Sequence, residues 1–490
     1  MIEENKMGVA NVPKLIVTMG LPMILSMVLQ ALYNVVDTVF VINMGQDGPI
    51  GNLALSAAFP VQIFMIAVGV GTGVGINALL SESLGKRESE TATKVVGNGL
   101  FLAGVFFVLF LLFGLFLSGP YMRLMSSDPK VVEMGKEYLT IVCCISIGSI
   151  GFAVAERFLI ASGRTNLSMI AQVSGAGANI LLDYVFIYPL HMGIAGAAYA
   201  TVIGQVLSFG LALLFHFLKD KEIKNSVKSL FPDKRVIGGI YRIGLPAFLM
   251  QGMLALTMFG CLLIIGTIGD EHVAKVLSGG YGIYYKLMQI ALFAAFGLSN
   301  TLISVVGYNR GAGDYRRVLA AAKYGELFTL LVTALIAVVY IAAAEPIARL
   351  FTLTVEESGE IKKSELIAVT TIALRISGAS YLFMGVSVAA QGVLQGAGRV
   401  WSPPIISLLR LIVLVYPTMY LFTRTLDPIG NIWWTYPIAE GCTAIVSLFF
   451  LVRTLKALKS ELGTPKEGKM TKETCSSEEG EETIDNRATA

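Results

Sequence analysis

The stretch GLPMILSMVLQALYN at residues 20–34 returns as GLPAFLMQGMLALTM at residues 244–258. Nearly half of the 490-residue chain separates the two copies. A second pair, AERFLIASGR at residues 155–164 and AQGVLQGAGR at residues 390–399, lies at almost the same separation. Two similar halves within one chain predict a fold built from an internal repeat.

The composition is that of a chain in a lipid bilayer. The sequence is 55% hydrophobic and 14% charged, with a mean hydropathy of +0.70, whereas soluble domains carry about 25% charged residues. An α-helix needs about 20 mostly apolar residues to cross a bilayer. We therefore predict an all-α polytopic membrane protein with twelve transmembrane helices in two pseudo-symmetric six-helix bundles, at residues 14–43, 52–84, 93–118, 133–160, 168–190, 194–217, 236–268, 278–309, 320–345, 365–396, 402–424 and 430–455.

The distribution of positive charge predicts the orientation of these spans. Most of the 37 Lys and Arg residues fall in the termini and in the loops on the same side as the termini. The positive-inside rule then places both termini in the cytoplasm, and the polar start MIEENKMGVANVPK has no cleavable signal. The net charge of +3 gives no indication of nucleic-acid binding.

The domain boundaries follow from composition and from the repeat. We expect an N-terminal bundle at 1–218, a cytoplasmic linker at 219–235, a C-terminal bundle at 236–456 and a disordered cytoplasmic tail at 457–490. Both copies of the repeat run in the same direction through the membrane, because six spans separate them. Transporters built from two such bundles bind substrate between them. The glycine series GVGTGVG at 69–75 lacks the flanking signals of a phosphate loop, so it predicts close helix packing instead.

Four acids lie at membrane depth: Asp37, Glu156, Asp183 and Glu440. A carboxylate at the bilayer centre costs at least about 2.5 to 3.5 kcal/mol, so it is rare and usually faces a cavity. For Glu156, an ion pair with the adjacent Arg157 competes with a role in substrate or proton binding. We expect Glu440 to be structural.

Asp37 belongs to a polar stripe along the first span. Gln30, Tyr33, Asn34 and Asp37 fall at i, i+3, i+4 and i+7, which places them on one face of a helix. Such a stripe lines water or a partner helix. Pro22, earlier in the same span, lacks a backbone donor and is our candidate for a hinge.

The repeat shows that these acids are confined to one half. The position related to Asp37 is Cys261, and the position related to Asp183 is Thr418. Acids with a purely architectural role would be needed in both bundles. The asymmetry therefore favours a functional role in the N-terminal bundle.

At these residues the sequence resembles the multidrug and toxic compound extrusion (MATE) family, and its MepA-like bacterial branch in particular. The resemblance rests on the two GLP starts, YNVVDT, ANILLDYVF, GIAGAAYAT and the paired SGR and GAGR loops, in this order over about residues 10 to 455. It implies that Asp37, Asn179, Asp183 and Thr201 match a proton or cation site, with Tyr33 and Gln30 nearby. Sodium would take the same four residues as ligands. The acids that some relatives carry in the C-terminal bundle are absent here.

The resemblance implies an antiporter that exports lipophilic, often cationic small molecules against an inward H⁺ or Na⁺ gradient. We expect a monomer in the plasma membrane of a prokaryote, needing no cofactor beyond the transported ion. A lipid-linked saccharide flippase is the alternative within transport, although it would need a large basic cavity for pyrophosphate. A polytopic membrane enzyme is disfavoured, because the short loops hold no nucleophile and base pair and no metal cluster.

Overall fold

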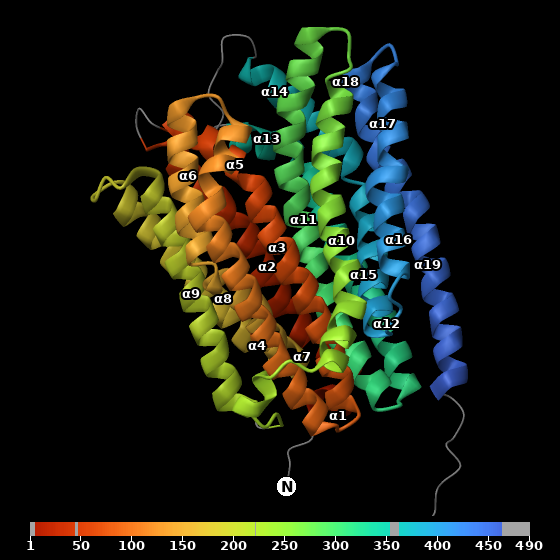
Figure 1. Ribbon diagram of the computed structural model, residues 1–490. Helices are drawn as coiled ribbons and strands as arrows, with labels where there is room; N and C mark the ends of the chain where they lie inside the picture. The colour runs from red at the N-terminus through yellow and green to blue at the C-terminus, as the bar shows by residue number, and fades with distance from the viewer. Residues whose placement is uncertain (1–4, 45–47, 221, 353–361, 463–490) are drawn as a thin grey trace, which may run out of the picture.

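The computed structural model describes residues 5–44, 48–220, 222–352 and 362–462, and in these ranges the chain forms helices and no strand. Figure 1 shows the helices of the two halves standing side by side. The first half contains α1 (Lys6–Val9), α2 (Val12–Ile42), α3 (Gly48–Gly85), α4 (Ser89–Leu112), the π-helical turn η2 (Phe113–Leu117), α5 (Ser118–Met125), α6 (Pro129–Cys144), α7 (Ile147–Ala161), α8 (Thr165–Ile187) and α9 (Gly193–Lys219).

The 3₁₀ turn η3 (Val227–Leu230) lies in the segment between the halves. The second half contains α10 (Lys234–Ile265), α11 (Glu271–Gly311), α12 (Tyr315–Ala342), α13 (Ala344–Thr352), α14 (Lys363–Ser377), α15 (Ser380–Gly396), α16 (Ser402–Leu408), the π-helical turn η4 (Leu409–Val413), α17 (Val415–Thr423), α18 (Pro428–Asn431), the 3₁₀ turn η5 (Ile432–Trp434) and α19 (Thr435–Leu462).

The structure has twelve membrane spans when each pair of helices joined by a bend is counted as one span. Within the described ranges, ten helical segments are long and apolar enough to cross a membrane. Two further spans are bent pairs, α6 with α7 at 43° and α14 with α15 at 57°. The two bends occupy the same place in each half, which agrees with the repeat, and the predicted fold class is confirmed.

Local sequence explains where the helices begin and end. Asp128, Asp233, Asp270 and Asp314 each cap a helix by accepting hydrogen bonds from backbone N–H groups of its first turn. The SGR and GAGR loops turn through glycines with positive φ, Gly163 at 79° and Gly398 at 72°. Glycine adopts this left-handed conformation at little cost, which explains why both copies of the loop keep it.

The bundles meet through two equivalent helix crossings, α2 with α11 and α3 with α10. At the second crossing, a Cβ on Gly71 would lie 2.8 Å from the Phe248 Cβ and 2.9 Å from the Gly244 carbonyl oxygen. Asn77 of α3 donates to the Asn300 carbonyl of α11 at 3.3 Å and accepts from Ser304 at 2.8 Å. The glycine series thus permits close helix packing, as predicted.

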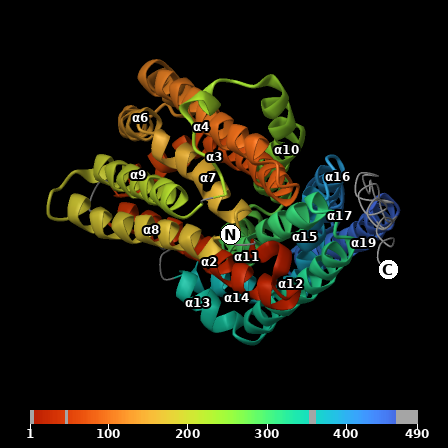
Figure 2. The same ribbon diagram turned by 90° about the horizontal axis from the view of Figure 1, so that it is seen from below.

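The contacts between bundles extend to the end of the molecule that carries α1 and the α3–α4, α7–α8 and α11–α12 turns, which we call the terminal face (Figure 2). Arg310 of α11 forms an ion pair with Glu82 of α3 at 3.4 Å. The Met7 carbonyl of α1 accepts from Asn309 at 3.1 Å and from Arg317 at 2.9 Å. The two bundles are therefore joined at this face.

One domain boundary needs correction. Residues 457–462, assigned from sequence to a disordered tail, continue α19. Leu458 is fully buried, and Glu461 accepts from Arg399 at 3.1 Å, so packing holds this last turn in place. The rest of the predicted tail, residues 463–490, lies outside the described residues.

Candidate functional site

Two aspartates of the first bundle face each other. Asp37 lies on α2 and Asp183 on α8, two helices that pack against each other, and the two carboxyl groups are close enough to interact electrostatically. Asp183 is fully buried, and Asp37 is partly buried. Both Asp183 oxygens and the Asp37 Oδ1 receive no hydrogen bond from the described protein atoms. Two acids with unsatisfied oxygens thus lie together in the interior of the first bundle.

Close packing of α8 and α9 brings Asn179 and Thr201 together. The Asn179 amide donates to the Thr201 hydroxyl at 3.5 Å. A Cβ on Gly204 would lie 2.7 Å from the Gly175 carbonyl oxygen and 3.0 Å from the Asn179 Cβ, so only glycine permits this approach. Asn179 precedes Asp183 by one helical turn, and its Oδ1 also lacks a donor among the described residues.

Two further residues of the predicted stripe reach a cavity. Gln30 and Tyr33 line the cavity, as do Asn179 and Thr201. The Tyr33 hydroxyl interacts with Gln205 of α9. Asn34 belongs to α2, but its side chain is outside the described part of the structure. Pro22 lies within α2, which runs as one helix from Val12 to Ile42.

Three residues near the acids were missed from sequence. Gln62 of α3 donates to the Tyr138 hydroxyl of α6 at 2.6 Å, and Tyr138 lies close enough to Asp37 and Asp183 to interact electrostatically. Gln205 is the third. All three are polar side chains within predicted spans, so a search for amides and phenols, rather than for acids alone, would have found them.

Glu326 of α12 is an acid that the search for carboxylates at membrane depth also missed. Both of its carboxyl oxygens are buried and receive no hydrogen bond from the described atoms. Its span, predicted at 320–345, begins only a few residues earlier. Glu326 lies in the second bundle and does not line the cavity between the bundles.

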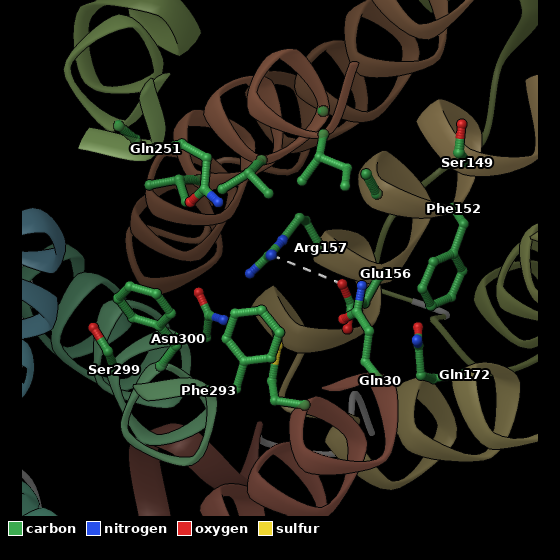
Figure 3. A pocket seen from close by; sticks show the side chains of 18 of the residues that line it. Gln30, Ser149, Phe152, Glu156, Arg157, Gln172, Gln251, Phe293, Ser299 and Asn300 are labelled. Carbon is green, nitrogen blue, oxygen red and sulfur yellow. Dashed lines mark ion pairs between the residues drawn. The ribbon is translucent and has the colours of Figure 1, made fainter. Parts of the chain in front are cut away.

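The cavity lies between the two bundles and has a volume of about 250 Å³. Helices α2, α3, α7, α8 and α9 line it on one side, and α10, α11, α15 and the η4 region line it on the other. Glu156 and Arg157 of α7 reach its wall, where they form a buried ion pair at 3.8 Å (Figure 3). Of the alternatives left open for Glu156, the ion pair with Arg157 is present, and the pair also lines the cavity.

The second bundle has different chemistry at the related place. Cys261, which corresponds to Asp37, is fully buried and interacts with Tyr281 and Tyr436. Nearby, Glu440 accepts from the Arg410 Nε at 2.6 Å, and both side chains are buried. The pairing agrees with the expected structural role of Glu440.

These observations define a class of protein. Two related helical bundles enclose a cavity, with buried acids on one side of it, and the described residues contain no group of three His, Cys, Asp or Glu side chains able to hold a metal ion. Two such bundles around a cavity are the architecture of a polytopic membrane transporter. A family model described as MatE matches residues 22–185 and 246–421, so the chain belongs to the MATE family.

Curated relatives and solved structures agree with this assignment. The multidrug export protein MepA of Staphylococcus haemolyticus is 24% identical over 442 residues, which cover 90% of this chain and 94% of that protein. MepA of Staphylococcus aureus (strain MRSA252) is 24% identical over 437 residues, which cover 88% of this chain and 92% of that protein. A crystal structure of MATE in the straight conformation matches with a TM-score of 0.85 at 25% identity, covering 94% of this chain and all of the other. A crystal structure of MATE in the bent conformation matches with a TM-score of 0.79, covering 93% of this chain and 98% of the other.

Proposed function

We propose that this protein exports lipophilic small molecules, cationic ones among them, in exchange for inward movement of H⁺ or Na⁺. The observation that carries the proposal is the Asp37–Asp183 pair, buried beside the cavity with unsatisfied oxygens. The names of the MepA relatives support multidrug export. In this proposal the terminal face is cytoplasmic, the membrane is the plasma membrane of a prokaryote, and the transporter is a monomer.

The chemistry of the site explains why an ion would bind there. Two carboxylates at close range in a water-poor interior repel each other, and loss of solvation disfavours both charges. A proton on one carboxyl would turn the repulsion into a hydrogen bond between the two groups. A sodium ion would relieve the same repulsion with oxygen ligands from Asp37, Asp183, Asn179 and Thr201.

Loading of this site would act on the packing of the first bundle. Its residues come from α2, α8 and α9, so occupation favours whichever arrangement of these helices brings the oxygens together. Pro22 is the proposed hinge of α2, because the missing N–H at a proline weakens the helix at that level. We further propose that the bundles at 1–218 and 236–456, joined by 219–235, rock about the cavity.

Coupling requires that the transported molecule and the ion influence each other. Tyr33 and Asn179 line the cavity and also lie next to the acids, so the two sites share a wall. If the loaded state disfavours the drug, the drug disfavours the ion by the same factor. The two ligands would then exclude each other, as antiport needs.

A lipid-linked saccharide flippase fits the cavity less well. A pyrophosphate group requires a concentration of uncompensated positive charge. Here Arg157 and Arg410 each lie beside a carboxylate, Glu156 and Glu440 respectively. The cavity wall is therefore close to neutral, which favours lipophilic molecules of low charge.

The test is substitution of each aspartate by Asn, followed by transport in proteoliposomes with pH and sodium gradients imposed separately. D37N and D183N should each abolish uphill efflux of a fluorescent cation, because the amide keeps the shape but cannot take the ion. D270N, on an exposed aspartate that caps α11, is the matched control and should leave efflux unchanged. Uphill efflux retained by both D37N and D183N would refute the coupling role, and the gradient that drives the wild type identifies the ion.

A further inference from the structure

Arg157 is the least satisfied cation on the cavity wall. Its side chain is only 4% exposed, and its partner oxygen, Glu156 Oε2, lies 3.8 Å from Nη2, which is too long for a good hydrogen bond. The Nε and Nη1 atoms have no hydrogen-bond partner among the described residues. A buried guanidinium with free donors carries a large desolvation cost unless a ligand or water accepts from it.

The surrounding helices hold the guanidinium in this position. Across from it on α3, a Cβ at Gly73 would lie 3.0 Å from the Arg157 Cγ and 3.1 Å from its Nε, so the glycine provides the space for the side chain. On the other side, Ser168 of α8 donates to the Glu156 Oε1 at 3.2 Å and holds that carboxylate. In Figure 3 the guanidinium lies between Glu156 and the amides of Gln251 and Asn300 from the second bundle.

The other arginine at the cavity, Arg410, provides a contrast. Its Nε donates to Glu440 at 2.6 Å, a short charge-assisted hydrogen bond, and no Arg410 nitrogen is among the buried atoms without a partner in the described residues. Nε is the atom that lacks a partner in Arg157. Of the two cavity arginines, Arg157 is thus the one with donors available to a ligand.

The rest of the wall fits a molecule that is mainly apolar. Met27, Met65, Phe152 and Phe293 line the cavity, with the amides of Gln30, Gln172 and Gln251 between them. Aromatic and Met surfaces suit varied lipophilic bodies, and the few polar groups set orientation. An apolar cavity of this kind also strengthens any ionic contact made inside it.

Building on the proposed efflux function, we propose that the cavity binds lipophilic molecules that carry a carboxylate, with the acid accepting from the guanidinium of Arg157. The planar guanidinium presents two pairs of parallel N–H donors, Nε with Nη2 and Nη1 with Nη2, and the two oxygens of a carboxylate accept from one such pair. Each pair contains one donor that has no partner among the described residues. The apolar body of the molecule then packs against the methionine and phenylalanine side chains. Glu156 competes with the ligand for the same guanidinium.

Three size-matched dansyl probes separate the charge from the apolar body. Dansyl-6-aminohexanoic acid carries a carboxylate, its methyl ester is neutral, and dansylcadaverine carries an ammonium group. Binding to the purified full-length protein in detergent is followed by dansyl fluorescence, and export of each probe is followed separately in proteoliposomes. The wild type should bind the acid more tightly than the ester.

The variants should shift this preference in opposite directions. R157Q should weaken binding of the acid about 10- to 100-fold and leave the ester within about twofold, since a hydrogen-bonded ion pair is lost. E156Q should strengthen binding of the acid several-fold, because the competing carboxylate is gone. R349Q removes an arginine of an exposed ion pair on α13 and serves as the control with unchanged binding.

The double variant E156Q/R157Q keeps the cavity wall neutral and should bind the acid and the ester with equal affinity. If R157Q fails to fold, the gain in affinity for the acid in E156Q tests the proposal by itself. Equal affinity of the wild type for acid and ester, or no gain in affinity for the acid in E156Q, would overturn the carboxylate site. Gradient-driven export of the amine would still uphold the efflux function in that case. Binding of the acid that depends on Arg157, with no gradient-driven export of any probe, would instead overturn the efflux function and uphold the site.

Discussion

Gly71 offers a direct test of how the bundles are held together at the crossing of α3 with α10. In G71A the new Cβ would lie 2.8 Å from the Phe248 Cβ, 2.9 Å from the Gly244 carbonyl and 3.2 Å from the Phe248 Cα. These are atoms at or next to the α10 backbone, so no side-chain rotation relieves the contact. Helices α3 and α10 must separate by about 0.5 Å, and overpacking of this kind costs about 1 to 3 kcal/mol.

This cost falls mainly on the state in which the two helices touch. A penalty of 1 to 3 kcal/mol lowers the ratio of closed to open molecules about 5- to 150-fold. Spin labels at Glu88 and Ala312, which are exposed on the α3–α4 and α11–α12 turns, report the ratio through double electron–electron resonance. G71A should reduce the short-distance population relative to wild type in a cysteine-free background.

The control is G238A on α10, since a Cβ there has nothing within 4 Å. It makes the same chemical change in one of the two contacting helices and should leave the distance distribution as in wild type. Matching distributions in G71A and G238A would contradict the argument that α3 and α10 touch at Gly71 in the closed state.

Three further outcomes follow from described contacts. Trp433 is fully buried against Tyr284, with ring centroids 5.2 Å apart. W433A should therefore lower the free energy of unfolding by about 3 to 5 kcal/mol, measured as a lower thermal unfolding midpoint in detergent, whereas W433F should lower it much less. Burial, and then the Arg164 charge, lower the pKa of Lys6, so docking of α1 should strengthen as the pH rises towards 10.5 and weaken as the pH falls. The mobility of a spin label at the exposed Val9 measures this docking, and K6M should remove its pH dependence. Truncation after Leu462 should leave thermal stability unchanged, whereas truncation after Ala457 should lower it, because it removes the buried Leu458 and the partner of Arg399.

Much of the fold could be predicted because the bilayer restricts the choices. Backbone polar groups in lipid must be satisfied within the chain, so each long apolar stretch becomes a helix and its length is set by the membrane. The bends within the fourth and tenth spans were not predicted. They fall near Ile145 and Gly378, where no proline marks a break.

The candidate site was predictable only where its residues lie on one helix. The spacing of Asn179 and Asp183 placed them on one face of α8, but sequence gave no measure of the distance from Asp183 to Asp37 or from Asn179 to Thr201. The first distance depends on how α2 packs against α8. The second depends on how closely α8 and α9 pack, which Gly175 and Gly204 decide. The pairing of Arg410 with Glu440 likewise depends on the contact between η4 and α19.

The difference between the two bundles bears on where an ion would be coupled. A group that binds and releases a transported ion must be incompletely satisfied by the protein in at least one state, because full internal pairing leaves the ion nothing to stabilise. In the first bundle, Asp37 and Asp183 have oxygens without donors. In the second, Cys261 replaces the first acid, and Glu440 is paired with Arg410 at 2.6 Å through one oxygen. Glu326 of the second bundle also has oxygens without donors among the described residues, but it does not line the cavity. The repeat thus supplies two similar frames for motion, and the unsatisfied acids beside the cavity support coupling through the first of them.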